Sequence, residues 1–223
     1  MVFNYARMAR VTDGINGGLS GKLGEVIFYT MNGGNYMRSL PSKKRKKTPP
    51  TPRQALQRER FVAMQEWLRP ITPLVREAFR YYAPRQTGHN AAMSYNLKNA
   101  LVRVDGKFEV NPEVFSFSVG PLPEAYRPSV HQDGAVVRFK WDIEKNALNV
   151  NHLDRTMLLL YREGQRYSEF LTYGNERWRL SDSLSLEDYK EGDVCHAYIA
   201  FISAKNQQVS NSVYVGMLTI EAF

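Results

Sequence analysis

The spacing of hydrophobic positions changes its period near residue 111 of this 223-residue chain. Between residues 61 and 82, apolar side chains recur three and four positions apart, which is the period of an amphipathic helix. From residue 111 onward they alternate with polar side chains, which is the period of a strand with one buried face. The pattern therefore predicts an α+β protein, with a hairpin and helices in residues 1–110 and a β domain in residues 111–223.

The helical part is predicted to contain two or three helices. Pro70 and Pro73 interrupt the apolar stripe, so two helices are favoured there, and one kinked helix is the alternative. Thr51 and Gln54 form a capping-box pattern at the start of the first helix, and Thr72 is expected to cap the second. The three helices are expected at residues 52–69, 73–83 and 90–101.

The β domain is predicted to be a seven-stranded antiparallel sandwich of the immunoglobulin or fibronectin type III kind. Its strand-like runs are short, turn residues separate them, and no helix intervenes, which fits that architecture. A small β-barrel is the competing architecture. The strands are expected at residues 114–120, 135–141, 156–161, 166–173, 177–180, 195–202 and 212–218.

Residues 25–40 are predicted to form a β-hairpin that turns at Asn32-Gly33-Gly34-Asn35. The hairpin follows a segment, residues 14–24, whose five glycines are too many for a regular element. A two-stranded hairpin is marginal in water, and this one has apolar side chains on both faces. We therefore expect it to pack on the rest of the chain or to pair with another subunit. The candidate interface residues are Val26, Phe28, Tyr29, Tyr36 and Met37.

Positive charge is concentrated in the first part of the chain. Residues 1–83 hold 15 Lys and Arg against 5 Asp and Glu, and residues 84–223 hold 15 against 17, so that net charges of +10 and −2 sum to the formal +8. Five consecutive cations precede a proline-rich stretch, and such a run favours an anionic partner that carries phosphates. The alternative is a solvated linker whose lysines protect a β-edge. The candidate phosphate-binding residues are Lys43, Lys44, Arg45, Lys46 and Lys47.

No residue pattern points to catalysis, a cofactor or a metal. The four histidines have no metal-ligand spacing, and residues 14–24 lack the Lys-Ser/Thr ending of a phosphate-binding loop. Cys195 adjoins His196, but neighbouring residues on a strand point to opposite faces, so a buried structural thiol is expected. The carboxylates before the sixth strand are expected to solvate a loop: Asp182, Glu187 and Asp188. We therefore expect a protein that is not an enzyme and that binds no cofactor.

Four motifs are spread over nearly the whole chain: Gly17-Gly18-Leu19-Ser20-Gly21-Lys22-Leu23-Gly24, Thr51-Pro52-Arg53-Gln54 with Arg58 and Phe61, Asn90-Ala91-Ala92-Met93-Ser94-Tyr95-Asn96-Leu97, and Ala200-Phe201-Ile202-Ser203 with Val209-Ser210-Asn211-Ser212-Val213-Tyr214-Val215-Gly216. Together they resemble an uncharacterised domain-of-unknown-function family of Bacteroidota. The first segment is also similar to short modules of phage-like and structural proteins. The family resemblance implies a start near Met8-Ala9-Arg10, and it implies no activity, cofactor or catalytic residue.

No apolar run reaches the roughly 18 to 20 residues that span a bilayer, and no secretory signal is recognisable. With a single cysteine, these features favour a cytoplasmic protein, or one in a particle assembled in the cytoplasm, with no membrane or small-molecule partner. We expect a non-enzymatic structural or interaction protein, a subunit of a homo-oligomer or of a larger, phage-like assembly. The alternative is a nucleic-acid-associated protein that binds phosphates through residues 43–47.

Overall fold

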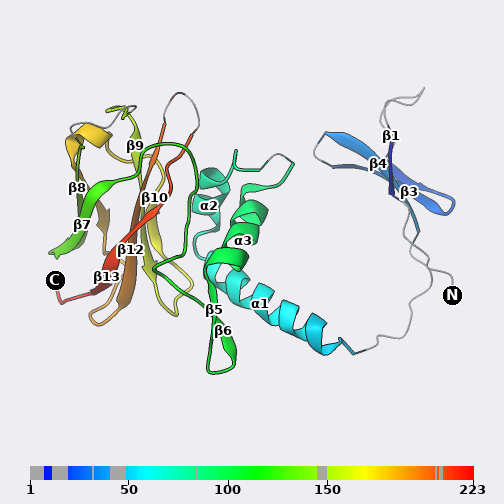
Figure 1. Cartoon of the computed structure of the whole chain (residues 1–223), viewed down its shortest axis with the longest axis horizontal. Coiled ribbons are helices and arrows are strands. Elements are labelled where there is room, and N and C mark those ends of the chain that lie inside the picture. The colour runs from blue at the N-terminus through cyan, green and yellow to red at the C-terminus, as the bar shows by residue number, and fades with distance from the viewer. Residues whose placement is uncertain are drawn as a thin grey trace. The chain divides into compact units, whose positions relative to one another are not determined.

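A computed structural model describes residues 8–11, 20–31, 33–40, 49–83, 85–144, 150–203, 205 and 208–223 (Figure 1). The chain divides into two compact units, residues 1–50 and 51–223. As predicted, the protein is α+β, and its described residues form three α-helices and several antiparallel sheets.

The N-terminal unit contains a four-stranded antiparallel sheet with the strand order β1-β4-β3-β2. Its strands are β1 (Met8–Val11), β2 (Gly21–Leu23), β3 (Val26–Met31) and β4 (Gly34–Ser39). The predicted hairpin is confirmed as β3 and β4, since β-branched and aromatic residues favour strands and Gly33 supplies the positive φ, 72°, of the turn. The sequence prediction missed β1 and β2, which pair with β4 and β3.

The second unit begins with three helices, α1 (Pro52–Leu68), α2 (Thr72–Ala78) and α3 (Gly88–Asn99). The capping box of α1 is confirmed, because Thr51 Oγ1 accepts from the Gln54 N–H at 3.3 Å and Gln54 Oε1 accepts from the Thr51 N–H at 3.1 Å. The prediction of two helices in place of one kinked helix is also confirmed. Among the described residues, no helix is long and apolar enough to cross a membrane.

Two details of the predicted second helix are wrong. Thr72 does not cap it, because the Thr72 hydroxyl donates to the carbonyl of Leu68 at 3.0 Å. Ile71 takes the N-cap position and makes no side-chain cap bond. The helix also ends at Ala78, well before residue 83, because turns replace it from Phe79 onward.

The third helix begins earlier than predicted and leads into a hairpin that the prediction missed. It begins at Gly88 because Thr87 Oγ1 accepts from the Asn90 N–H at 3.3 Å. The hairpin consists of β5 (Leu101–Val104) and β6 (Lys107–Val110). Asp105 and Gly106 form its turn, with positive φ angles of 47° and 83°.

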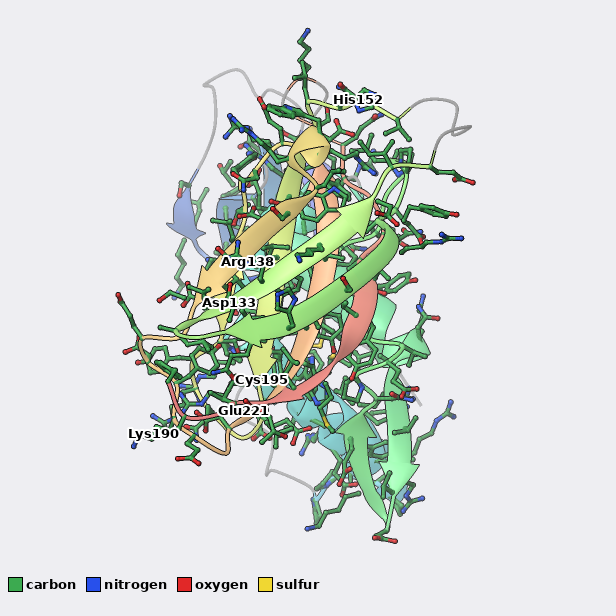
Figure 2. The ribbon with its side chains drawn as sticks, turned by 90° about the vertical axis from the view of Figure 1, so that its left-hand side faces the viewer. Asp133, Arg138, His152, Lys190, Cys195 and Glu221 are labelled. Atoms are coloured by element: carbon green, nitrogen blue, oxygen red, sulfur yellow. The ribbon has the colours of Figure 1, made fainter. Side chains whose placement is uncertain are left out.

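The rest of this unit forms two antiparallel sheets and no barrel. The four-stranded sheet has the order β10-β9-β12-β13 and consists of β9 (Arg155–Arg162), β10 (Glu169–Leu171), β12 (Val194–Ile202) and β13 (Val213–Thr219). The three-stranded sheet has the order β11-β8-β7 and consists of β7 (Tyr126–Asp133), β8 (Val136–Asp142) and β11 (Ser181–Ser185). Figure 2 shows the three-stranded sheet in front, with Arg138 paired to Asp133 at 3.0 Å across the β7–β8 hairpin.

Five of the predicted strands are confirmed, as β8, β9, β10, β12 and β13. Residues 114–120 form no strand, although Phe115 and Phe117 are buried. Their backbone bonds to side chains instead of to a neighbouring strand: the Phe117 N–H donates to Ser212 Oγ and the Gly120 N–H to Asn211 Oδ1, each at 3.1 Å. The alternating pattern in this segment therefore reflects burial without a ladder of backbone bonds.

The predicted strand at residues 177–180 is also wrong, because it is the 3₁₀ helix η1 (Arg177–Arg179) followed by Leu180 at a φ of 60°. The missed strands are β7 and the short, serine-rich β11. As a consequence Asp182 is not a loop carboxylate. It lies on β11, where it accepts from the Asn175 N–H at 2.7 Å and from the Thr156 hydroxyl.

Hydrophobic packing joins the helices to the sheets. One cluster lies between the two sheets and includes Val137, Phe139, Leu158, Leu160, Ala197 and Ile199. A second cluster lies on the other face of the four-stranded sheet, beneath the helices, and includes Met64, Leu68, Phe79, Met157, Leu159 and Ile202. The central strands β9 and β12 are thus buried on both faces. The compact unit accordingly starts at Thr51, and a separate domain that starts at residue 111 stays a prediction.

Candidate functional site

Most of the net positive charge of the protein lies in its N-terminal unit. Residues 1–50 hold 9 Lys and Arg against 2 Asp and Glu, a net of +7, whereas residues 51–223 hold 21 against 20, a net of +1. The predicted phosphate-binding residues Lys43, Lys44, Arg45, Lys46 and Lys47 lie outside the described residues. Their role stays a prediction. The other candidate residues lie on the sheet that precedes them in the chain.

One face of the N-terminal sheet is apolar. Because directly paired residues of an antiparallel sheet point to the same face, the pairing of Phe28 with Met37 and of Val26 with Leu23 puts four apolar side chains together. Leu23 is 72% exposed, and the other three are half-buried. We call the set of Leu23, Val26, Phe28 and Met37 the apolar face.

The opposite face combines aromatic and basic side chains. Tyr29 pairs with Tyr36, and their rings stack with centroids 5.7 Å apart and planes 22° from parallel. The guanidinium carbon of Arg38 lies 5.7 Å from the centroid of the Tyr29 ring, within reach of a cation–π interaction. Lys22 and Arg38 both pair with Ile27. We call the set of Lys22, Ile27, Tyr29, Tyr36 and Arg38 the aromatic-basic face.

The structure therefore divides the predicted interface residues between two surfaces. It brings Val26, Phe28 and Met37 together on the apolar face and places Tyr29 and Tyr36 on the other. Arg38 was considered only as an extension of the basic run, and Lys22 was not predicted as a site residue, although the alternation of side chains along a strand could have grouped Arg38 with Tyr36. Within residues 20–31 and 33–40, every side chain is exposed or half-buried, and the sole buried residue is Gly34.

In the second unit, a groove of about 650 Å³ runs beside Trp67 and Glu163. Trp67 stacks on Tyr161 with ring centroids 4.0 Å apart. Behind them, His196 Nε2 lies 2.6 Å from Glu163 Oε1, and His196 Nδ1 lies 3.1 Å from the Tyr214 hydroxyl. Both ring nitrogens of His196 are therefore engaged by side chains of the same unit. Sequence reasoning missed this group, whose members are distant in the chain.

The cysteine next to His196 is a buried structural thiol, as predicted. Cys195 is fully buried in the cluster between the sheets, on the opposite face of β12 from His196. Burial raises its pKa to about 12, with Asp193 adding to the effect, so the reactive thiolate is scarce at neutral pH. Figure 2 shows Cys195 well away from His152. Among the described residues, no three His, Cys, Asp or Glu side chains are grouped to hold a metal ion.

An ion pair is buried at the end of the three-stranded sheet. Arg177 lies 3.7 Å from Asp154, and both side chains are almost fully buried. Burial lowers the pKa of Arg177 to about 10 and raises the pKa of Asp154, and in each case the partner opposes the shift. The guanidinium also donates to the carbonyls of Pro123 and Glu124, at 2.7 and 3.2 Å. These contacts hold the segment before β7 against η1, which indicates a structural role for the ion pair.

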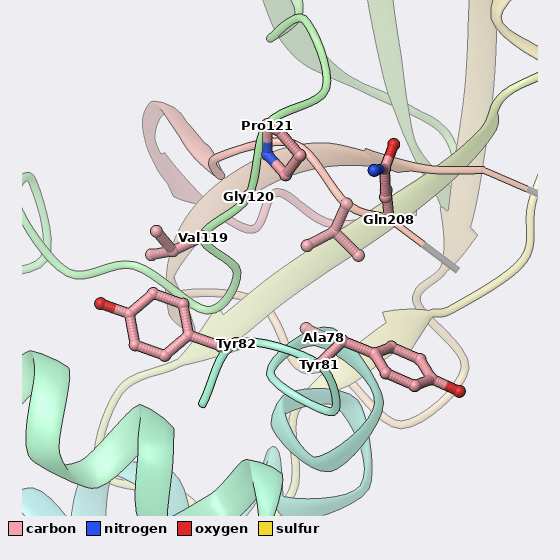
Figure 3. Close-up of a pocket in the computed structure, with 8 residues that line it drawn as sticks. Ala78, Tyr81, Tyr82, Val119, Gly120, Pro121 and Gln208 are labelled. Atoms are coloured by element: carbon pink, nitrogen blue, oxygen red, sulfur yellow. The ribbon is translucent and has the colours of Figure 1, made fainter. Parts of the chain in front are cut away.

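A second cavity, of about 440 Å³, lies between the end of α2 and residues 119–121 (Figure 3). Tyr81 and Tyr82 line it and are 54% and 45% exposed, and Figure 3 shows their rings diverging. A Cβ at Gly120 would lie 2.2 Å from the carbonyl oxygen of Val209, so the lack of a side chain there is a packing requirement. The residues that the structure describes around this cavity include no charged side chain.

Comparison with known proteins bears on the family alone. A search of curated proteins finds no match. The model of the "Family of unknown function (DUF6266)" matches residues 18–216, a span that includes the hairpin, the helices and nearly all of both C-terminal sheets. The sequence-based resemblance to a family of unknown function is therefore confirmed. On the strength of a match over most of its length, the chain belongs to the Family of unknown function (DUF6266).

Proposed function

We propose that this protein is a non-enzymatic structural or interaction protein, a subunit that assembles with a second copy of itself through the apolar face. The observation that carries the proposal is the lack of a buried side chain in residues 20–31 and 33–40, which include strands β2, β3 and β4. A sheet gains its stability from a covered hydrophobic face. A sheet with no covered face needs a partner, and exposed apolar patches mark such contacts.

A second copy is the occupant that the geometry favours. The apolar face is short and has no charged side chain, so the same patch on another chain can face it about a two-fold axis. The cations Lys22 and Arg38 lie on the opposite face and would not be brought into contact by such a pairing. Charged residues are depleted at the centres of protein interfaces for this reason.

The second unit supports a role in binding instead of catalysis. We infer that its sheets form a fibronectin type III-like sandwich of seven strands, because the orders β11-β8-β7 and β10-β9-β12-β13 enclose one shared core. Such a fold presents surface and brings no chemistry of its own. Of the two side chains best suited to catalysis, Cys195 is fully buried, and His196 is almost fully buried with both ring nitrogens hydrogen-bonded.

The experiment is a mass measurement in solution by light scattering, before and after nuclease treatment. We expect the full chain to have a mass that is a multiple of the monomer mass and that nuclease does not change. Phe28→Gln and Met37→Gln should reduce this mass to that of the monomer. Ile27→Gln is the matched control, since it makes a similar change on the same strand but on the opposite face. A parent chain that is monomeric at high micromolar concentration would refute the proposal.

A further inference from the structure

We propose that the aromatic-basic face binds single-stranded nucleic acid, with the tyrosine rings stacking on bases and the two cations contacting phosphates. This inference concerns the face opposite to the one that the proposed function uses. It also does not depend on the basic run at residues 43–47. It rests on the arrangement of five side chains on neighbouring strands.

The side chains form two adjacent rows across the sheet. Tyr36 and Tyr29 make one row, on β4 and β3. Arg38, Ile27 and Lys22 make the next row, on β4, β3 and β2. The rows are two residues apart along each strand, which is about 7 Å. An aromatic platform and a strip of positive charge thus run side by side, which is the combination that binds single strands with little sequence preference.

Charge favours a polyanion over other partners. Without residues 43–47, the unit still holds 4 Lys and Arg against 2 Asp and Glu, a net of +2. Its single acidic side chain among the described residues is Glu25, in the turn between β2 and β3. An exposed Arg38 above the Tyr29 ring can stack on a base or pair with a phosphate. An acidic protein surface would satisfy the cations, but a nucleic acid supplies a flat ring and a phosphate together in every repeating unit.

The aromatic row also selects unpaired bases. Bases in a duplex stack on one another and present their edges, whereas bases of a single strand can be splayed onto aromatic side chains. Gly34 contributes by its lack of a side chain, since a Cβ at this position would lie 3.0 Å from the Tyr36 ring. The Tyr36 ring can therefore lie close over the strand, next to Tyr29. Gly34 is a positioning residue for this platform.

The test measures binding of the full chain to a fluorescent strand of roughly 10 nucleotides, as DNA and as RNA, by anisotropy; this length lies within the site size of one binding module. Tyr29→Leu and Tyr36→Leu should each weaken binding by about 5- to 150-fold, which is the range expected for the loss of one stacked base. The conservative Phe variants should bind as the parent does. Tyr167→Leu is the matched control, because Tyr167 is 81% exposed and lies on the second unit.

Salt dependence separates the two rows. The double variant Lys22→Gln/Arg38→Gln should reduce the slope of log affinity against log salt by about 1.4, since each contact with a single strand contributes about 0.7. The Leu variants of the tyrosines should lower affinity and leave this slope unchanged. The corresponding change at Lys140, an exposed cation on β8, should alter neither quantity.

Three results would overturn the proposal. One is affinity of Tyr29→Leu and Tyr36→Leu for the single strand that equals that of the parent. Another is a loss of duplex affinity in these variants that is as large as their loss of single-strand affinity. The third is a chain with no affinity for either strand at about 50 mM salt, where such contacts are strong. The outcome is independent of assembly: Phe28→Gln should lose the higher mass and keep its affinity for the short strand. Failure of either proposal therefore leaves the other testable.

Discussion

Removal of residues 1–110 tests whether the sheets of the second unit can fold without the helices. The sequence alone predicts that the fragment 111–223 folds by itself. The structure argues against this, because the helices cover one face of the four-stranded sheet. Residues Met157, Leu159 and Ile202 on that face are at most 3% exposed in the full chain. In the fragment, these side chains would lose their packing against the helices and become more exposed to solvent.

The size of the effect follows from these three side chains. Full burial of a Leu, Ile or Met side chain contributes roughly 1.5 to 3 kcal/mol, so the three together account for about 5 to 9 kcal/mol. A domain of this size is stable by about 5 to 15 kcal/mol in total. The loss is therefore comparable with the whole stability of the fold, although Phe115 and Phe117 remain in the fragment and can cover part of the face.

We expect the fragment 111–223 to show a collapsed amide spectrum and no cooperative thermal transition. The fragment 51–223 is the control and should unfold cooperatively, since it contains the whole compact unit. In the full chain, Phe79→Ala should lower the free energy of unfolding by about 3 to 5 kcal/mol, because Phe79 is fully buried in the cluster between the helices and the four-stranded sheet. A dispersed spectrum and a sharp melt for 111–223 would refute this reasoning and support the boundary at residue 111.

Four further predictions concern three single residues and the basic run at residues 43–47. Burial raises the pKa of Asp154 above its ordinary value of 3.8. The stability that the protonated carboxyl contributes is therefore present below pH 3.8 and is lost as the pH rises through the raised pKa. Asp154→Asn should remove this pH-dependent loss from urea midpoints measured over a series of pH values. Gly88→Ala should lose about 1 to 3 kcal/mol in denaturant unfolding despite better helix propensity, because its Cβ would lie 2.3 Å from the carbonyl oxygen of Arg76. Cys195 should resist a thiol reagent at pH 8 until urea unfolds the protein, and rapid labelling of the native state would contradict its burial. Replacing all five cations of residues 43–47 with Gln should reduce the salt slope for duplex DNA by about 4 to 5 with little change in stability; an unchanged slope would leave the run a solvated linker.

The sequence predicts local structure well where one residue pattern has one structural cause. The capping box of Thr51 and the hairpin around Gly33 are confirmed for this reason. The prediction fails for residues 114–120, because alternating burial looks the same whether the backbone bonds to a strand or to side chains such as Asn211. It also misses β11, whose serines have no strand preference and whose pairing with β8 is set by the surrounding fold.

For the candidate site, the sequence predicts which residues of one strand share a face, but not how the strands align across the sheet. Alternation along β3 separates Phe28 from Tyr29, and this follows from any strand assignment. The register that places Tyr36 beside Tyr29, and Lys22 beside Ile27, depends on the turns and on β2, which the sequence did not reveal. The contact between Trp67, Tyr161 and His196 could not be predicted from the sequence, because the three residues lie on separate elements.

Strands β9 and β12 have no face that is exposed to solvent, and we expect this to limit the substitutions that they tolerate. In β8, exposed or half-buried positions alternate with buried ones, so every second residue is open to replacement. Along residues 156–161 and 195–202, by contrast, both sets of alternate positions are buried. A scan of all substitutions should show two unbroken intolerant stretches there and a striped pattern along β8. Labels and affinity tags accordingly belong on the outer surface of β7, where side chains can change without disturbing either cluster.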